Sequence, residues 1–345
     1  MFINDLKKEL KNVNESIYDF SADSTMDFYH SGCYSLNLLT SGSIFKGIAP
    51  RIYIFAGPES SGKTFLMCSI TKNFIEESDK NYVVYFETEE GVSSSIRQSV
   101  GITKEKGKQV VCLPISTVQD FREQSLLVIN KFVEHKKENP DSKMMIILDS
   151  IGMLSTSKEI SDVESGKDTL DMTRAKLIRS AFRILTLKLG LNNIPLVCTN
   201  HTYEDIGLFT KVNMSGGKSL YYSASCIIFL SPKIEKGVGK IINAKVIKSR
   251  FSKEGSEVNL RILYNKGLDP YYGLLELAEM TKLITKSGSW YVFPDGRKAQ
   301  RKTIEESPHE YFTEEFLKEL DCFSYPYYNY STYDSKELEY DQQED

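Results

Sequence analysis

The residues best suited to chemistry lie in one short segment, GPESSGKT, at positions 57–64. The segment matches the pattern G-x-x-x-x-G-K-[ST], whose glycines let the backbone turn tightly and direct amide N–H groups at phosphate oxygens. In such a loop Lys63 neutralises the β- and γ-phosphates of a nucleotide, and the hydroxyl of Thr64 binds Mg²⁺. The residues expected to bind the nucleotide here are Gly57, Pro58, Glu59, Ser60, Ser61, Gly62, Lys63, Thr64 and Phe65.

The surroundings of this segment favour a phosphate loop over the alternative, a glycine-rich structural turn. The apolar run IYIF precedes the segment and predicts a buried strand. Apolar residues recur at helical spacing after Lys63, so a helix is expected to begin there, with its positive dipole end beneath the phosphates. The sequence therefore predicts a strand, a loop and a helix in that order.

Two further apolar runs end in carboxylates. The run YVVYF leads into Glu87, Glu89 and Glu90, and the run MMIIL leads into Asp149. Because the carboxyl ends of parallel strands meet at one edge of a sheet, Asp149 is expected opposite Thr64, where it would bind Mg²⁺ through water. A carboxylate on the neighbouring strand could polarise the water that attacks the γ-phosphate. Alternatively, Asp149 caps a helix; Glu87 and Glu90 are interpreted as solvated loop charges or supporting groups.

A third run, IPLVCT, ends in Asn200 and His201. We interpret His201 as a sensor that couples the state of the γ-phosphate to the loop that follows; the alternative is an isolated surface histidine. That loop, residues 202–222, is too long for an ordinary connection, and a similar polar stretch, residues 155–168, follows the run that ends in Asp149. Both loops are expected on the same side of the sheet and to be functional or mobile.

Composition limits the class of protein. The chain has 345 residues, 41% hydrophobic and 26% charged, which allows one large α/β domain with appendages. Strands that alternate with helices predict a doubly wound, mostly parallel sheet. Because we find no apolar run of about 18 residues and no signal peptide, we expect a soluble intracellular protein without a membrane partner. Six cysteines without C-x-x-C spacing indicate buried free thiols rather than disulfides or a zinc site.

The charge is unevenly distributed. Residues 303–345 hold 13 acidic side chains against Lys318 and Lys336, whereas the other 302 residues hold 41 basic and 34 acidic side chains. A mildly basic body with an acidic end is common in proteins that bind DNA and regulate that binding with their own tail. The alternative is that the tail only increases solubility.

Taken together, these segments resemble the RecA-type recombinases, and in particular the UvsX recombinases of T-even-like bacteriophages. The resemblance covers residues 30–290 and rests on motifs in the family's order, namely GPESSGKT, YFETEEG, MIILDS, DMTRAKLIRSAFRI, IPLVCTNHTYE, MSGGKSLYYSAS, IKSRFSKEG and LDPYYGLLELA. It implies a RecA-like P-loop ATPase core with a mostly parallel central sheet. The divisions that it implies are an N-terminal oligomerisation region at 1–45, the core at 46–270, a small C-terminal region at 271–324 and an acidic, tyrosine-rich tail at 325–345.

The resemblance also implies functions for single residues. Glu89 matches the catalytic glutamate that activates water, Asp149 with Ser150 the Walker-B pair, and His201 the γ-phosphate sensor. Lys248 and Arg250, in IKSR, match paired cations that reach the neighbouring subunit's ATP. Where the family stacks an aromatic residue on adenine this chain has no tyrosine, so Ile96 or Arg97 would have to cover the base. The two long loops match DNA-binding loops, which implies DNA contacts from Lys158, Lys167, Arg174, Lys211, Gly216, Gly217 and Lys218.

The function implied is an ATP- and Mg²⁺-dependent recombinase that forms helical filaments on single-stranded DNA and catalyses pairing and strand exchange with double-stranded DNA. Recombination, repair and recombination-dependent replication in the cytoplasm of an infected bacterial host follow from that resemblance. So do a homo-oligomeric filament, a phage single-stranded DNA-binding protein and a recombination mediator as partners. Two alternatives keep the same core: a ring helicase or DNA-packaging motor, and a non-catalytic accessory protein that binds nucleotide as a switch.

Overall fold

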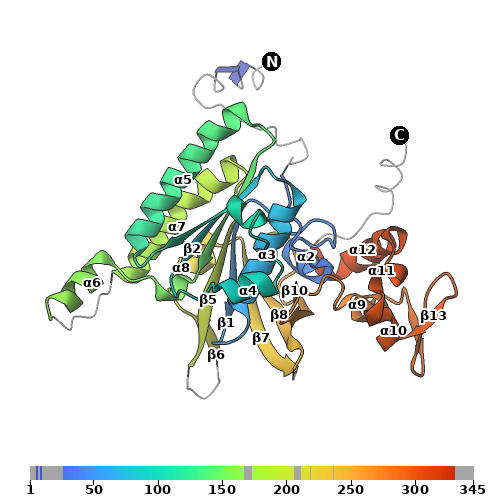
Figure 1. Ribbon diagram of the computed structural model, residues 1–345. Helices are drawn as coiled ribbons and strands as arrows, with labels where there is room; N and C mark the ends of the chain where they lie inside the picture. Colours follow the sequence, from blue (N-terminus) through green and yellow to red (C-terminus); the bar gives the residue numbers. More distant parts are fainter. Residues whose placement is uncertain are drawn as a thin grey trace.

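The computed structural model places a long twisted sheet at the centre of the chain (Figure 1). The structure describes residues 26–166, 173–205, 211–217, 219–235 and 237–330, together with Asp5, Leu6, Lys8 and Glu9. The first part of the oligomerisation region expected at 1–45 thus lies largely outside the described residues.

The sheet is mostly parallel and has the strand order β10-β9-β8-β7-β1-β5-β4-β2-β3. Neighbouring strands from β3 to β7 along this order are parallel, and β8, β9 and β10 are added antiparallel at one end. This arrangement confirms the α/β fold with a mostly parallel central sheet. The strands are β1 (Ile52–Gly57), β2 (Asn81–Glu87), β3 (Val110–Pro114), β4 (Lys143–Asp149), β5 (Leu196–Asp205), β7 (Cys226–Glu235), β8 (Gly239–Ser249), β9 (Glu257–Leu263) and β10 (Gly267–Leu268).

Helices cover both faces because the central strands are apolar on both sides. Alternate residues of β1 enter two separate cores: Tyr53 and Phe55 lie in one with side chains of α2 and α3, and Ile52 and Ile54 lie in the other with side chains of α5 and α7. The helices beside the sheet are α2 (Tyr34–Ser41), α3 (Lys63–Glu77), α4 (Ser94–Ser99), α5 (Val118–Glu138), α7 (Arg174–Leu191) and α8 (Ser219–Ser223), with short 3-10 turns η1 (Lys106–Gln109) and η2 (Ile151–Met153).

The segment before β1 is part of this core. Tyr29, Leu36, Leu39 and Ile48 are at most 1% exposed and pack with α3 and the sheet. Asn37 holds the segment's turn, since its side chain accepts from the Ser31 amide and donates to the Ile44 carbonyl. Within the region expected at 1–45, the described residues from Tyr29 onward contribute to the chain's own core.

The C-terminal region is a small three-stranded sheet with short helices, shown in orange and red in Figure 1. Its elements are α9 (Leu274–Met280), β11 (Thr285–Ser287), β12 (Trp290–Val292), β13 (Lys298–Gln300), α10 (Arg301–Glu306), α11 (Pro308–Tyr311) and α12 (Glu314–Tyr328). The division expected at 324/325 falls inside α12, because Phe316, Leu320, Ser324 and Tyr328 form one buried stripe at four-residue spacing. The tyrosine-rich segment thus begins as a packed helix.

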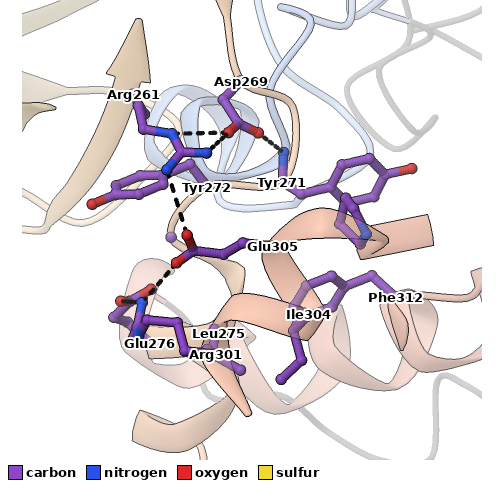
Figure 2. A pocket seen from close by; sticks show the side chains of 12 residues that line it. Arg261, Asp269, Tyr271, Tyr272, Leu275, Glu276, Arg301, Ile304, Glu305 and Phe312 are labelled. Carbon is purple, nitrogen blue, oxygen red and sulfur yellow. Dashed lines mark hydrogen bonds and ion pairs between the residues drawn. The ribbon is translucent and has the colours of Figure 1, made fainter. Parts of the chain in front are cut away.

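A chain of ion pairs joins this region to the edge of the central sheet (Figure 2). Arg261 on β9 contacts Asp269 at 2.9 Å and Glu305 at 3.5 Å, and Arg301 contacts Glu305 at 3.3 Å and Glu276 at 2.7 Å. The Arg261 and Asp269 side chains are only 16% and 17% exposed. Ion pairs in such partly buried networks stabilise more than solvated ones.

Replacing Arg261 therefore tests how firmly the C-terminal region is attached. We expect Arg261→Met to lower the free energy of unfolding by about 1–3 kcal/mol, because Asp269 loses its charged partner while remaining partly buried. Urea unfolding followed by circular dichroism measures this. The control is Lys302→Met, whose ion pair with Glu306 is longer and exposed and whose loss should cost less than about 0.5 kcal/mol. Equal effects of the two substitutions would show that the ion pairs of Arg261 do not stabilise the attachment of the C-terminal region.

Candidate nucleotide-binding and catalytic site

The phosphate loop follows β1 directly and leads into α3, as the sequence predicts. Gly62 precedes the helix with a φ of 89°, in the left-handed region that favours glycine. At Gly57 a Cβ atom would lie 2.7 Å from Ser61 Oγ and 2.9 Å from the Leu230 carbonyl oxygen. Both glycines of the motif are thus required by the backbone path, which supports a phosphate-binding loop.

Lys63 lies inside this loop. Its ammonium group donates to the carbonyl oxygens of Gly57 at 3.1 Å and Pro58 at 2.8 Å, and the residue is 7% exposed. Burial lowers the pKa of Lys63, and the charges of Asp149 and Glu89 oppose that shift. A partly dehydrated cation at the start of a helix is suited to neutralising phosphate oxygens.

Asp149 ends β4 and is held by hydroxyl groups from both neighbouring strands. The Tyr85 hydroxyl donates to Oδ2 at 2.9 Å, and the Thr199 hydroxyl donates to Oδ1. The residue is 7% exposed, and burial together with this carboxylate raises the pKa of Tyr85 well above its ordinary value. The carboxylate is therefore oriented by the sheet itself.

The oxygen ligands at this site fit Mg²⁺. In the described part of the chain, no cluster of three or more histidine, cysteine or acidic side chains could hold a metal alone. Mg²⁺ typically uses one or two protein oxygens together with water and substrate phosphates. Asp149 and the Thr64 hydroxyl are such oxygens, so these two residues would hold the ion beside the phosphates.

Glu89 lies next to this site as a carboxylate with two hydrogen-bond donors. The Ser150 hydroxyl donates to Oε1 at 2.6 Å, and Nε2 of His201 lies 3.0 Å from the same oxygen. Burial raises the pKa of Glu89, but these hydrogen bonds and the charges of His201 and Lys63 outweigh it, so that the pKa is lowered overall. Glu89 is thus ionised at neutral pH, as a general base must be.

His201 is tied to the β5–β6 hairpin. The adjacent Asn200 accepts from the His201 amide at 2.9 Å and donates to the Ser215 carbonyl at 2.7 Å, and the Ser215 amide donates to the His201 carbonyl at 3.0 Å. Gly152 makes room for the imidazole, since a Cβ atom there would lie 2.8 Å from His201 Cδ2. The arrangement brings together Glu89, His201 and the hairpin.

The two stretches expected as long loops, residues 155–168 and 202–222, contain regular secondary structure. In the second, β5 continues to Asp205 and pairs antiparallel with β6 (Lys211–Met214), followed by Gly216, Gly217 and α8. In the first, α6 (Ser157–Glu164) forms behind a capping box of Thr156 and Glu159. Both stretches are thus partly regular, because pairing and capping satisfy their backbone groups. Lys158 is exposed on α6, whereas Lys167, Lys218 and the side chain of Lys211 lie outside the described residues.

Arg174 is placed differently from the expected DNA contact. Its guanidinium donates to the carbonyl oxygens of Leu154 at 2.5 Å, Gly152 at 2.5 Å and Ile151 at 3.3 Å. It therefore holds the turn that follows Asp149. This placement favours a positioning function for Arg174 over a contact with DNA.

Lys248 and Arg250 lie at the opposite end of the strands from the phosphate loop. Ser249, between them, pairs with Cys226, which pairs with Tyr53 at the start of β1. The four residues from there to Gly57 span about 13 Å. The Lys248 ammonium donates to the carbonyl oxygens of Tyr221 and Ala224 around the end of α8, and burial and Arg250 lower its pKa. Neither cation is near its own chain's phosphate loop.

Sequence reasoning missed one aromatic residue near the site. Ile96 and Arg97, the residues expected to cover the base, lie on α4, which buries none of its side chains. Tyr264, 41% exposed on the turn between β9 and β10, has its ring 6.3 Å from that of Phe65, directly after the phosphate loop. Tyr264 therefore joins Ile96 and Arg97 as a candidate to cover the base. No local pattern marks it, because its relation to Phe65 exists only in three dimensions.

Comparison with known proteins agrees with this geometry. A model of the RecA N-terminal domain family matches residues 4–269. The chain belongs to this family. Members similar to it include the recombination and repair protein of Enterobacteria phage T4, 29% identical over 263 residues, and Protein RecA of Treponema denticola, 27% identical over 289 residues. These matches cover 74% and 79% of this chain, and 64% and 66% of the respective relatives.

Another RecA family member, Protein RecA of Clostridioides difficile, is 24% identical over 325 residues, with 87% of this chain and 89% of the relative covered. The chain thus spans about two thirds of the length of the first two relatives and most of this one. In the described part of the chain, no helix is long and apolar enough to cross a membrane.

The hydroxyl group of Thr199 offers a test of the Asp149 site. We expect Thr199→Val to lower the free energy of unfolding by about 1.5–3 kcal/mol, because a buried carboxylate oxygen loses a hydrogen bond. Urea unfolding at pH 7 measures the change. Thr199→Ser keeps the hydroxyl group and is the matched control, which should retain most of the stability. If valine and serine behave alike, the hydrogen bond does not stabilise Asp149.

Proposed function

We propose that the chain is an ATP-dependent DNA recombinase that assembles into helical filaments on single-stranded DNA and pairs that strand with homologous double-stranded DNA. The observation that carries the proposal is that the expected site residues lie at opposite ends of the strands. One end holds Lys63, Asp149 and Glu89, and the other end holds Lys248 and Arg250. Membership of the RecA family supports it.

In this proposal the chain's own residues hold and hydrolyse the nucleotide. Lys63 and the amides of the loop bind the phosphates, and Thr64 and Asp149 hold Mg²⁺, which neutralises charge on the phosphates. Ionised Glu89 accepts a proton from the attacking water, while His201 and Ser150 fix the orientation of its carboxylate. The phosphate-dependent position of His201 is passed to the β5–β6 hairpin through Asn200 and Ser215.

Assembly would complete the site. A cation supplied by a neighbouring subunit stabilises the charge that develops on the γ-phosphate, so hydrolysis depends on assembly. Arg250 is exposed and suited to that contact. The docking element would lie before residue 29, since the chain from Tyr29 onward packs in its own core.

DNA would bind along the segments that hold α6 and the β5–β6 hairpin. Lys158, Lys167, Lys211 and Lys218 are the proposed contacts, with the amides of Gly216 and Gly217. Such contacts to phosphates are largely independent of sequence, so affinity should fall steeply with salt. A phage single-stranded DNA-binding protein, a recombination mediator and the cytoplasm of an infected bacterium belong to the same proposal.

ATP turnover with and without single-stranded DNA, with negative-stain images of the same samples, tests the proposal as a whole. Strong stimulation by DNA together with open helical filaments is the expected result. Closed rings that unwind duplex DNA would favour the motor instead, and undetectable DNA-stimulated turnover would favour a nucleotide switch. Deletion of residues 1–27 should leave a monomer; unchanged filaments would place the docking element elsewhere.

The hydrogen bond from Ser150 predicts a pH dependence. Turnover requires ionised Glu89, so activity should fall on the acid side as its carboxylate becomes protonated. In Ser150→Ala the carboxylate loses a donor, its pKa rises, and the acid limb of kcat moves to higher pH. A pH series of DNA-stimulated turnover measures this. Ser116→Ala, on an exposed residue, is the control and should leave the limb in place; an unmoved limb in Ser150→Ala would remove that hydrogen bond from the mechanism.

Mixing two inactive variants tests whether the site is shared between subunits. Lys63→Ala lacks the lysine of its phosphate loop, and Arg250→Ala lacks the cation that it would supply to its neighbour. In a mixed filament, an interface is complete where the phosphate loop of an Arg250→Ala subunit meets the Arg250 of a Lys63→Ala subunit. We expect an equimolar mixture to recover about a quarter of wild-type turnover, because one in four random interfaces is complete. A mixture of Lys63→Ala with Glu89→Gln is the control, since both residues lie at the same end of the strands. Equal activity of the two mixtures would contradict a shared site.

A further inference from the structure

An open cavity of about 320 Å³ lies between α4 and the central sheet, beside α3. Its walls come from α3, β2, β3, α4 and the segment 102–107. Figure 1 shows α4 in front of the sheet, next to α3. Although α4 covers the cavity, none of its side chains is buried. The helix therefore covers the cavity without filling it with side chains.

Polar groups without protein partners converge on this space. Thr71 is 2% exposed, and its hydroxyl oxygen has no hydrogen-bond partner among the described residues. A buried hydroxyl group in that state costs free energy unless a ligand or water satisfies it. Arg97 also lines the cavity, and its guanidinium forms no ion pair with any carboxylate that the structure describes. Lys104 provides a second cation at the wall.

The remaining walls are mainly apolar and carry little negative charge. Burial raises the pKa of the Cys68 thiol to about 12 and that of Cys112 to about 11, so both sulfur atoms stay protonated. The nearby carboxylate of Glu87 is engaged by the Val92 amide at 2.5 Å and by the Cys112 thiol at 3.4 Å. Among the described residues the lining itself has two cations, Arg97 and Lys104, and no carboxylate, which favours an anion. Thiols and aliphatic walls favour an aromatic body.

We propose that this cavity is a binding site for a small aromatic anion, with its rings against Cys68 and Val110 and its anionic group on Arg97. The site is separate from the phosphate loop. In this proposal Arg97 lines the cavity, which leaves Ile96 and Tyr264 as the candidates to cover the base. Thr64, Cys68 and Thr71 follow one another along one face of α3, so the cavity begins about one helical turn, roughly 6 Å, beyond Thr64. A ligand there would fix α4, the helix that follows Glu89. The proposal does not depend on the recombinase assignment.

Binding of 1-anilinonaphthalene-8-sulfonate to the full chain, followed by its fluorescence at saturating Mg–ADP, tests the proposal. We expect saturable binding that weakens about tenfold in Arg97→Gln and is lost in Val110→Trp, which fills the cavity. The controls are Lys131→Gln, an exposed cation on α5, and Val111→Trp, whose side chain points to the other face of β3. Both should bind as wild type does. The proposal would be overturned if Arg97→Gln and a correctly folded Val110→Trp both bound the dye as the wild type does. Displacement of the dye by ADP would overturn it as well.

A second measurement uses the wild-type chain and so does not depend on the folding of a variant. The dye should slow alkylation of Cys112 by N-ethylmaleimide about fivefold or more, because it covers the thiol. The half-buried Cys322 on α12 is the internal reference, and its rate should not change. Peptide mass spectrometry gives both rates. Equal rates at Cys112 with and without dye would place the dye outside the cavity and refute the proposal.

Discussion

The buried carboxylate of Asp149 is the constraint on which the rest of the site depends. An ionised carboxylate is stable at that depth only if hydrogen bonds replace water, and here hydroxyl groups of Tyr85 and Thr199 supply them from β2 and β5. A shift of either strand by one residue would turn its hydroxyl group to the other face of the sheet. The register of the three strands and the orientation of the proposed metal ligand therefore determine each other.

A second set of contacts, made by side-chain hydrogen bonds, connects the site to the β5–β6 hairpin. Glu89 is connected to His201, and Asn200 to Ser215, by side-chain hydrogen bonds between separate segments of the chain. The contact between Glu89 and His201 is partly exposed, with side chains 39% and 28% accessible, whereas Asn200 is buried. Such contacts can change without unfolding the sheet. In the proposed function the part held by the sheet would bind the phosphates, and the hydrogen bonds to the hairpin would respond to them.

The sequence allowed prediction of those parts in which local pattern determines structure. Gly57, Gly62 and Lys63 have a fixed spacing, and the buried parallel strands are continuous apolar runs, so the loop and the sheet could be predicted. The sequence predicts a loop where the β5–β6 hairpin lies, because residues 202–205 and 211–214 are mostly polar and pair with each other only in the folded chain. The resemblance implies a DNA contact for Arg174, because the sequence does not show the backbone carbonyls that surround its guanidinium. Tyr264 approaches Phe65 through tertiary packing, which leaves no local signal.

The position of Lys248 and Arg250 limits what a single chain can do. Because β1, β7 and β8 are held in register, the cations cannot move to the phosphate loop of the same chain without breaking the sheet. In the proposed filament the end of the strands that carries these cations would contact the phosphate loop of the next subunit, which is a head-to-tail contact. Each added subunit would then complete one site and present another incomplete one, so turnover would follow the number of interfaces.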